Sequence, residues 1–210
     1  MFTGIITEVG KVKEVEESNN GKTFEIEAPK TVKNKEIGSS IAINGVCTTV
    51  TELKENSFKC HAIPETLELT NLGSLRPESE VNLESPLTLN QALDGHLVQG
   101  HVDGVGKVTE FQKSEKTILR IQFPQKLAPY LSHKGSITIN GVSLTISKLY
   151  TNELEVSLIP HTIKETNFRN LQIGDLVNLE IDLIARYLKN LLDNKEKETK
   201  YEFLQERGFL

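Results

Sequence analysis

The residues best suited to chemistry are histidines and cysteines that lie close together in the sequence. His96 and His101 lie within a glycine-rich stretch, residues 95–106, near the middle of the chain. They are five residues apart, whereas the helical zinc motif places its two histidines four apart, with a glutamate between them. Cys60 and His61 are adjacent, so in a strand their side chains point to opposite faces. Neither pair predicts a metal site.

The central glycines do not match a nucleotide-binding loop either. Gly104 and Gly106 lack the third glycine that a dinucleotide-binding turn requires. No serine stands in the Gly-x-Ser-x-Gly pattern of a nucleophile elbow. The sequence therefore predicts neither a metal nor a bound cofactor.

The composition is that of an ordinary globular protein. The chain has 210 residues, 25% of them charged and 37% hydrophobic, and a net charge of −5 without a dense basic segment, which argues against a nucleic-acid partner. No apolar run approaches the roughly 20 residues of a membrane-spanning helix, and the N-terminus does not resemble a signal peptide. Cys47 and Cys60 are too few for a disulfide framework. We expect a cytoplasmic protein that contacts no membrane.

The elements that must position these residues are revealed by a repeat at an offset of 96 residues. The segment 41–50 returns as 137–146, each with an Asn-Gly pair inside an alternating apolar pattern. The same offset aligns Gly4 with Gly100, 9–12 with 105–108, 63–66 with 159–162, 70–71 with 166–167, and 81–84 with 177–180. Such a period suits a small domain rather than a solenoid unit. We predict tandem domains over residues 1–96 and 97–185, followed by a tail over 186–210.

Each repeat is dominated by short alternating strands. The Asn-Gly pairs indicate hairpins, although such a pair can also mark a bulge inside one bent strand. Segments 58–64 and 154–160 are typical of strands that end at a proline, and 174–181 of a strand after a turn. Short helical pieces are expected at 65–67 and 126–131. The predicted fold is all-β, with two tandem, homologous, small Greek-key-like antiparallel β-barrels plus a C-terminal amphipathic α-helix.

The tail carries an apolar stripe at helical spacing. Its members are Leu183, Ile184, Tyr187, Leu188, Leu191 and Leu192. The stripe either packs back onto its own barrel or mediates self-association, and the pattern favours neither. Beyond Asp193 we expect a solvated charged stretch, with Tyr201, Phe203, Leu204 and Phe209 docking locally.

The two repeats keep their backbone pattern while polar side chains diverge. In order of first and second copy, the differing pairs are Ile5 and His101, Cys47 and Ser143, Glu65 and His161, Ser85 and Ile181, and Pro86 and Asp182. This divergence has two alternative explanations. One is neutral drift after duplication, and the other is that the two repeats form related pockets with different functions. The residues alone slightly favour drift.

Four motifs together resemble the riboflavin synthase alpha-chain family. They are the N-terminal Met-Phe-Thr-Gly-Ile, the segment 44–50, the central 95–104 and the segment 140–146. The resemblance covers residues 1–192. It implies an enzyme that transfers a four-carbon unit between two molecules of 6,7-dimethyl-8-ribityllumazine, giving riboflavin and 5-amino-6-(D-ribitylamino)uracil without a metal or redox cofactor. It also implies a homotrimer, held partly by C-terminal helices, whose sites form between barrels of neighbouring subunits, and in some relatives enclosure within a lumazine synthase shell.

The resemblance also implies the site residues. The first pocket matches at Gly4, Ile5, Ile6, Cys47, Thr48, Thr49, His61, Ala62, Ile63, Pro64, Glu65 and Thr66. The second matches at Gly100, His101, Val102, Lys134, Ser143, Leu144, Thr145, Ile159, Pro160, His161, Thr162, Ile163 and Lys164. Proton transfer at the substrate's acidic C7 methyl requires general acids and bases. We assign Ser143 and Asp182 as a proton-handling pair, His101 as acid/base or orienting group, and Cys47 as nucleophile or water activator. Ser40 and His96 are weaker candidates.

Two departures and two alternatives accompany this interpretation. Asn140 stands where the family usually has aspartate, and Gln99 replaces a small residue. A non-catalytic carrier of lumazine or flavin with the same fold would lose polar site residues. Here all four of those residues are kept, namely Cys47, His101, Ser143 and Asp182. A trimeric scaffolding protein has only the tail helix in its favour. The enzyme is therefore the favoured prediction.

Overall fold

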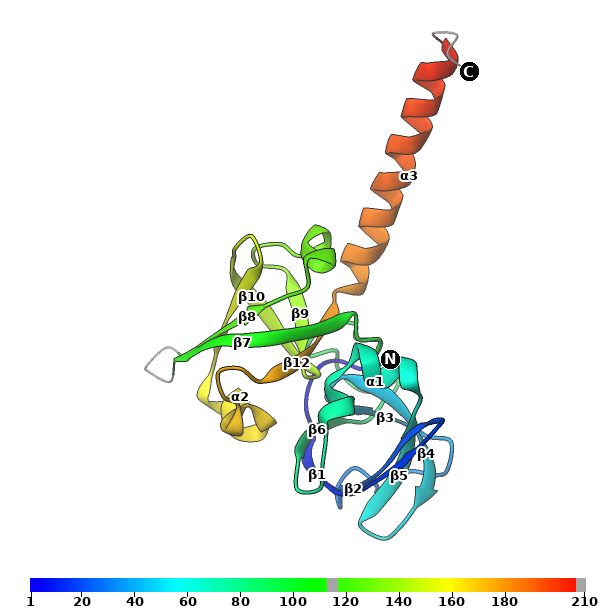
Figure 1. Ribbon diagram of the computed structural model, residues 1–210, viewed down its shortest axis with the longest axis vertical. Helices are drawn as coiled ribbons and strands as arrows, with labels where there is room; N and C mark the ends of the chain where they lie inside the picture. The colour runs from blue at the N-terminus through cyan, green and yellow to red at the C-terminus, as the bar shows by residue number, and fades with distance from the viewer. Residues whose placement is uncertain (113–116, 207–210) are drawn as a thin grey trace.

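The computed structural model describes residues 1–112 and 117–206, with side chains described as far as residue 194 outside that gap. Each repeat forms a closed antiparallel barrel, and the two barrels lie side by side (Figure 1). A long C-terminal helix projects away from both. The predicted all-β tandem architecture with a terminal helix is confirmed.

The first barrel is built by six strands in the order β1-β2-β5-β4-β3-β6. Their bounds are β1 Glu8–Ser18, β2 Gly21–Glu27, β3 Ser40–Ile43, β4 Val46–Leu53, β5 Ser57–Ala62 and β6 Glu80–Glu84. The short helix α1, Pro64–Leu69, and the 3-10 turn η1, Asn71–Ser74, connect β5 to β6. The strand that was expected to end at Pro64 ends at Ala62, and the predicted short helix begins at Pro64.

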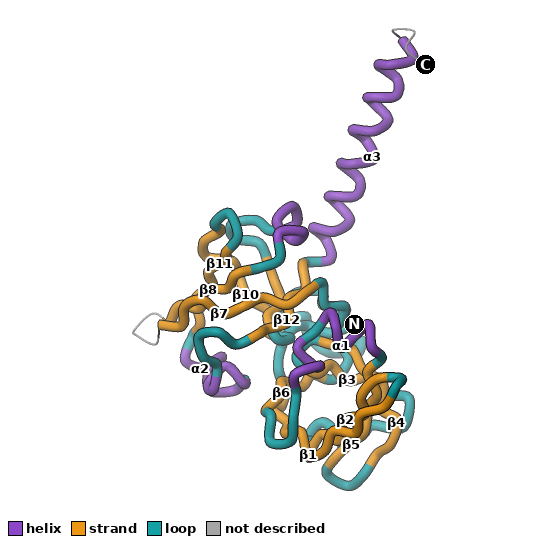
Figure 2. The backbone as a smooth tube through the Cα atoms, viewed as in Figure 1, coloured by secondary structure: helices purple, strands orange, loops and turns teal. Residues whose placement is uncertain are grey.

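The second barrel repeats this plan in the order β10-β11-β8-β7-β12-β9. Its strands are β7 Gly104–Gln112, β8 Thr117–Gln122, β9 Ser136–Ile139, β10 Val142–Leu149, β11 Glu153–Leu158 and β12 Leu176–Ile181. Three short helical pieces join them, η2 Gln125–Tyr130, α2 Pro160–Glu165 and η3 Asn167–Asn170 (Figure 2). The helical piece expected at 126–131 is thus a 3-10 turn.

Alternation of apolar and polar residues closes each barrel around its own core. In β4, Val46, Thr48 and Val50 point inward while Cys47 and Thr49 are exposed. The Asn-Gly pairs form tight hairpins between β3 and β4 and between β9 and β10, with positive φ at both residues of each pair. This is the geometry of a type I′ turn, so the hairpin prediction is confirmed. Bulges do occur on the same strands, between Val50 and Glu52 and between Ile146 and Lys148.

The barrels meet through six buried or half-buried asparagines in three pairs related by the 96-residue offset, Asn44 and Asn140, Asn71 and Asn167, and Asn82 and Asn178. The Asn71 N–H donates to Asn178 Oδ1 at 2.6 Å, and the Asn167 N–H donates to Asn82 Oδ1 at 2.7 Å. Asn71 Nδ2 donates to Asn140 Oδ1 at 3.0 Å. The contacts repeat in both directions, so the two barrels are related by a pseudo-twofold axis.

The C-terminal helix α3 runs from Leu183 to Glu206, so it begins before the boundary expected at residue 186. Its backbone is helical through the charged stretch 195–200. Arg186 anchors its first turns to Asp103 of the second barrel at 2.8 Å. The side chains of Tyr201, Phe203, Leu204 and Phe209 lie outside the described part.

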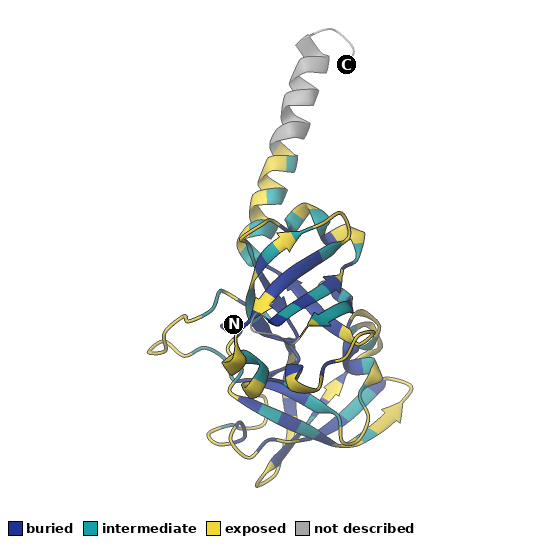
Figure 3. Ribbon diagram, turned by 90° about the vertical axis from the view of Figure 1, so that its left-hand side faces the viewer, coloured by how far each residue is buried: buried dark blue, intermediate teal, exposed yellow. Residues whose placement is uncertain are grey.

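The first turns of α3 are largely exposed (Figure 3), and the apolar stripe faces solvent in the single chain. Ile184, Tyr187, Leu188, Leu191 and Leu192 are each more than half exposed, at 54–65%. Apart from Leu183, which is half-buried, the helix therefore does not pack this stripe onto its own barrel. Within residues 1–112 and 117–206, no helix combines the length and apolar character needed to cross a membrane.

Candidate functional site

A cavity of about 370 Å³ opens on the outer face of the second barrel. Its lining residues are Asp94, Gly95, Ser136, Ser143, Leu144, Thr145, Ser157, Ile159 and Thr162. Five of these are predicted site residues, namely Ser143, Leu144, Thr145, Ile159 and Thr162. Ser136 and Ser157 were missed, although the repeat offset relates them to Ser40 and His61, which were predicted candidates. Asp94 and Gly95 come from the connection between the repeats, which has no counterpart in the first copy.

Ser143 on β10 is hydrogen-bonded to a histidine from that connection. His96 Nδ1 lies 2.7 Å from Ser143 Oγ, and its Nε2 lies 3.3 Å from Thr138 Oγ1 on β9. Burial lowers the pKa of His96 below 6.5, while the nearby Asp182 opposes that shift. A neutral imidazole can accept the serine proton at Nδ1 and donate its Nε2–H to Thr138. His96, a weaker candidate from the sequence, is thus the contact partner of Ser143.

Asp182 lies where β12 passes into α3. Its Oδ1 accepts the Ile184 N–H at 2.9 Å, which satisfies an amide of the first helical turn. Asp182 is linked to Ser143 through His96. Ser143 is hydrogen-bonded to His96, and the charge of Asp182 partly offsets the lowering of the His96 pKa by burial. Ser143 therefore contacts His96 directly, whereas Asp182 acts on His96 through its charge.

The N-terminal segment of each repeat crosses to the opposite barrel. The Ser143 N–H donates to Gly4 O at 2.8 Å, and the Cys47 N–H donates to Gly100 O at 2.9 Å. Ile6 packs against the core of the second barrel, and Val102 against that of the first.

The predicted grouping of residues into pockets is therefore wrong in one respect. Gly4, Ile5 and Ile6 belong beside Ser143, whereas Gly100, His101 and Val102 belong beside Cys47. The alignment of the repeats places each segment correctly within its own copy. It carries no information about which barrel the segment contacts, because that depends on how the two copies pack.

The corresponding face of the first barrel carries Cys47 and Thr49, which are both exposed on β4. Thr48 between them points inward, and its hydroxyl donates to Ile41 O at 2.9 Å. Ala62 is also buried. Thr48 and Ala62 can therefore offer a ligand only their backbone groups.

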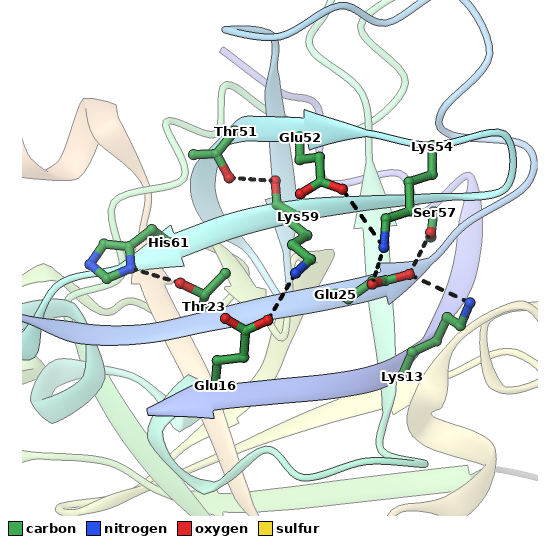
Figure 4. A network of polar contacts seen from close by, with 10 residues as sticks. All are labelled: Lys13, Glu16, Thr23, Glu25, Thr51, Glu52, Lys54, Ser57, Lys59 and His61. Carbon is green, nitrogen blue, oxygen red and sulfur yellow. Dashed lines mark hydrogen bonds and ion pairs between the residues drawn. The ribbon is translucent and has the colours of Figure 1, made fainter. Parts of the chain in front are cut away.

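His61 ends this face on β5 and is exposed (Figure 4). Its Nε2 lies 3.0 Å from Asn20 O, and its Nδ1 lies 3.2 Å from Thr23 Oγ1. Since a carbonyl oxygen only accepts, Nε2 carries the proton and Nδ1 accepts from the threonine hydroxyl. The ring is held in one orientation at the end of the strand.

The remaining predicted residues lie around the rims. Ile63 and Ile159 are exposed at the N-termini of α1 and α2. These helices carry Pro64, Glu65 and Thr66 in the first copy, and Pro160, His161, Thr162, Ile163 and Lys164 in the second. Lys134 is exposed in the turn before β9, with a φ of 68°.

The two cysteines differ in reactivity because they differ in burial. Cys47 is exposed, whereas burial raises the pKa of Cys60 to about 12. Cys60 is therefore a protonated core residue. In the parts of the chain that the structure describes, no three His, Cys, Asp or Glu side chains gather as a metal site would require.

Comparison with known proteins agrees with this architecture. The lumazine binding domain model matches twice, at residues 3–86 and 99–182. The chain is similar to the riboflavin synthase of Actinobacillus pleuropneumoniae, with 41% identity over 215 residues and 100% of both chains covered. It is 40% identical to that of Bacillus subtilis (strain 168), again over 100% of both chains. LumP bound to 6,7-dimethyl-8-(1'-D-ribityl)lumazine has the same fold, with a TM-score of 0.79, 23% identity, and coverage of 86% of this chain and 99% of LumP.

Proposed function

The chain belongs to the riboflavin synthase family, and on that premise we propose how it carries out the reaction of that family. Two molecules of 6,7-dimethyl-8-ribityllumazine react, and a four-carbon unit passes from one to the other. The products are riboflavin and 5-amino-6-(D-ribitylamino)uracil. Together they contain the same atoms as the two substrates, so no external oxidant or reductant enters the balance.

The observation that carries this proposal is the Ser143–His96 hydrogen bond at the cavity of the second barrel. The reaction begins when a proton leaves the acidic C7 methyl of one lumazine. A serine hydroxyl bonded to a neutral imidazole can relay that proton, because the imidazole accepts it at Nδ1. Asp182 next to His96 stabilises the imidazolium that results.

The tandem repeat suits a reaction between two copies of one molecule. We assign one lumazine to the Ser143 face of the second barrel and the other to the Cys47 face of the first. Holding both reactants in a fixed mutual orientation can supply up to about 7–11 kcal/mol of the barrier. The hydroxyls of Thr49, Thr66, Thr145 and Thr162 are assigned to ring or ribityl oxygens. His101 orients the ligand beside Cys47, whose thiol acts as nucleophile or activates water.

Assembly follows from the unpartnered face of α3. The exposed stripe on this helix is suited to pack against the same helix of other copies, which supports the homotrimer. In such an assembly a Cys47 face and a Ser143 face of neighbouring subunits oppose one another. Association with a lumazine synthase shell and a cytoplasmic location stay predictions.

One assay separates the enzyme from the carrier. The purified protein is mixed with 6,7-dimethyl-8-ribityllumazine, and riboflavin is followed by its visible absorbance. We expect riboflavin to accumulate while two lumazines disappear for each riboflavin formed. Tight binding without turnover would leave the carrier, and the fold that LumP shares makes this the second candidate.

A further inference from the structure

Two buried glutamates with no place in the mechanism above lie beneath the crossing segments. Glu84 ends β6 and Glu180 lies in β12, and the repeat offset relates them. They are 3% and 4% exposed. A buried carboxylate needs donors around it, and here the donors are backbone amides and one hydroxyl rather than cations.

Each glutamate binds the glycine turn of its own repeat. Glu84 Oε1 accepts the Thr3 N–H at 2.6 Å and the Thr3 hydroxyl at 2.8 Å, and its Oε2 accepts the Gly4 N–H at 3.0 Å. Glu180 accepts the Gln99 N–H at 2.7 Å and the Gly100 N–H at 3.0 Å. Gln99 has no hydroxyl to add, so Glu180 has one donor fewer than Glu84.

The same glycines touch the opposite barrel. Gly4 and Gly100 adopt φ of +78° and +81°. A Cβ at position 4 would lie 2.6 Å from Ser143 Cβ, and one at position 100 would lie 2.6 Å from Cys47 Cβ. With the backbone bonds from Ser143 to Gly4 and from Cys47 to Gly100, each carboxylate is one residue away from a reactive side chain of the other barrel.

We propose that Glu84 and Glu180 are positioning residues that act across the pseudo-twofold, Glu84 on the Ser143 face and Glu180 on the Cys47 face. The assignment of these faces to the two substrates rests on the proposed function. The mechanical coupling does not, because it follows from the contacts alone. Removing either carboxylate charge loosens the turn that it binds, and the backbone of that turn then holds Ser143 or Cys47 of the other barrel less firmly.

The surroundings of Glu180 fit this role. Burial raises the pKa of Glu180 to about 7, and the negative charge of Asp103 adds to this shift. The hydrogen bonds from the Gln99 and Gly100 amides oppose it. Asp103 is in turn paired with Arg186 of α3. Burial also raises the pKa of Glu84, where the Thr3 amide and hydroxyl and the Gly4 amide oppose the shift.

The test uses a thiol as reporter on each face of the full-length protein. Cys47 is the natural reporter, because Cys60 is buried. A Cys47→Ser, Ser143→Cys double variant moves the reporter to the second face. Glu84→Gln and Glu180→Gln are introduced into each background, and the rate of reaction with 5,5′-dithiobis(2-nitrobenzoate) is measured. Glu8→Gln is the matched control, because Glu8 is also buried and accepts the Lys30 and Thr31 amides without reaching the other barrel.

We expect a crossed result. Glu180→Gln accelerates modification of Cys47 about tenfold, and Glu84→Gln accelerates modification of the thiol at position 143 by a similar factor. Each leaves the other reporter within about twofold, as Glu8→Gln does for both. Equal acceleration of both reporters, or none, would overturn the proposal.

A measurement on the unmodified chain covers the case in which a variant does not fold. The Gly4 and Gly100 amides should exchange with deuterium at least about tenfold more slowly than the exposed turn amide of Asn20. Rapid exchange at Gly4 and Gly100 would also overturn the proposal. Neither experiment requires turnover, so a protein that binds lumazine without converting it can still confirm the coupling.

Discussion

His96 Nδ1 and Ser143 Oγ lie 2.7 Å apart, although the two residues belong to different parts of the chain. Ser143 comes from a strand of the second barrel, and His96 from the connection between the repeats. The first copy has cysteine at the position of Ser143. The contact therefore distinguishes this face of the second barrel from the corresponding face of the first, where Cys47 stands at the position of Ser143.

Ser143→Ala should lower turnover more than it lowers affinity. We expect kcat to fall roughly tenfold to hundredfold, with the lumazine Kd within about threefold of the unchanged protein. Stopped-flow and equilibrium fluorescence measurements separate the two. Ser147→Ala is the control, because Ser147 lies on the same strand and binds the Glu155 carbonyl at 2.9 Å. Loss of binding in Ser143→Ala would make Ser143 a binding residue instead.

His96 should set the acid limb of the pH profile. Its pKa is lowered below 6.5 by burial, so the ring is neutral at pH 7 and accepts a proton only in more acidic solution. We expect kcat/KM to fall with acid below pH 6.5, and His96→Gln to remove that limb while lowering the plateau about 100-fold. An acid limb that persists in His96→Gln would assign it to another group.

The same shift has a consequence for folding. The unfolded chain binds a proton at the ordinary pKa of 6.5, whereas the folded chain binds it only at lower pH. The unfolded state thus holds more protons in this window, and stability is lost as the pH falls through 6.5. Urea unfolding at pH 7.5 and 5.5 should show a smaller loss for His96→Gln than for the unchanged protein.

Asn140 should tolerate aspartate but not alanine. Its Oδ1 accepts the Asn178 N–H at 2.8 Å and Asn71 Nδ2 at 3.0 Å, so the position requires an acceptor. We expect Asn140→Asp to change the free energy of unfolding by less than about 1 kcal/mol. Asn140→Ala should lose about 2–4 kcal/mol, because it removes both hydrogen bonds and strains a backbone with φ of 46°. Asn140→Gly removes the bonds without the strain and should fall between them.

The asparagines illustrate which structural features could be predicted from the sequence and which could not. The Asn-Gly pairs predicted the hairpins, because two residues with positive φ leave a strong local signal. Asn140 departs from the aspartate that is usual in the family, and the structure places this residue at the contact between the two barrels. A contact between two repeats leaves no periodic pattern in either, so its purpose could not be inferred.

The contact of each N-terminal segment, at Gly4 and at Gly100, with the opposite barrel could not be predicted for the same reason. The repeat offset aligned the two glycines, and the apolar pattern defined both barrels. The contacts of the glycines with Ser143 and Cys47 run through backbone groups, which are the same for every residue type except proline. These contacts require a positive φ and leave no room for a Cβ atom, so the only sign of them in the sequence is a glycine.

Self-association through α3 can be tested by a single charge. Leu188 is 54% exposed on the apolar stripe, so Leu188→Lys should shift the assembly toward monomer in light scattering. Truncation before Leu183 should do so more completely and lower activity, since it also removes the Arg186 contact with Asp103. Asn190→Lys, also exposed, is the control. An unchanged mass in the truncated chain would mean that the barrels alone hold the assembly.

Glu25 should stabilise the first barrel above pH 4.5 and progressively less below it. This buried carboxylate accepts Lys54 Nζ at 2.6 Å and the Ser57 hydroxyl at 2.8 Å (Figure 4). The hydrogen bond from Lys54 lowers the pKa of Glu25 from 4.5 to about 2, against the opposing effect of burial. A depressed pKa in the folded state means that the stabilisation is lost as the pH falls from 4.5 to about 2.

Glu25→Gln therefore tests the network at two pH values. At pH 7 we expect it to lower the free energy of unfolding by about 1–3 kcal/mol, with the difference from the unchanged protein shrinking toward pH 3. Glu52→Gln should change it by less than about 0.5 kcal/mol, because that exposed carboxylate lies 3.7 Å from Lys54. A Glu25→Gln difference that is the same at pH 7 and pH 3 would assign the effect to packing instead of charge.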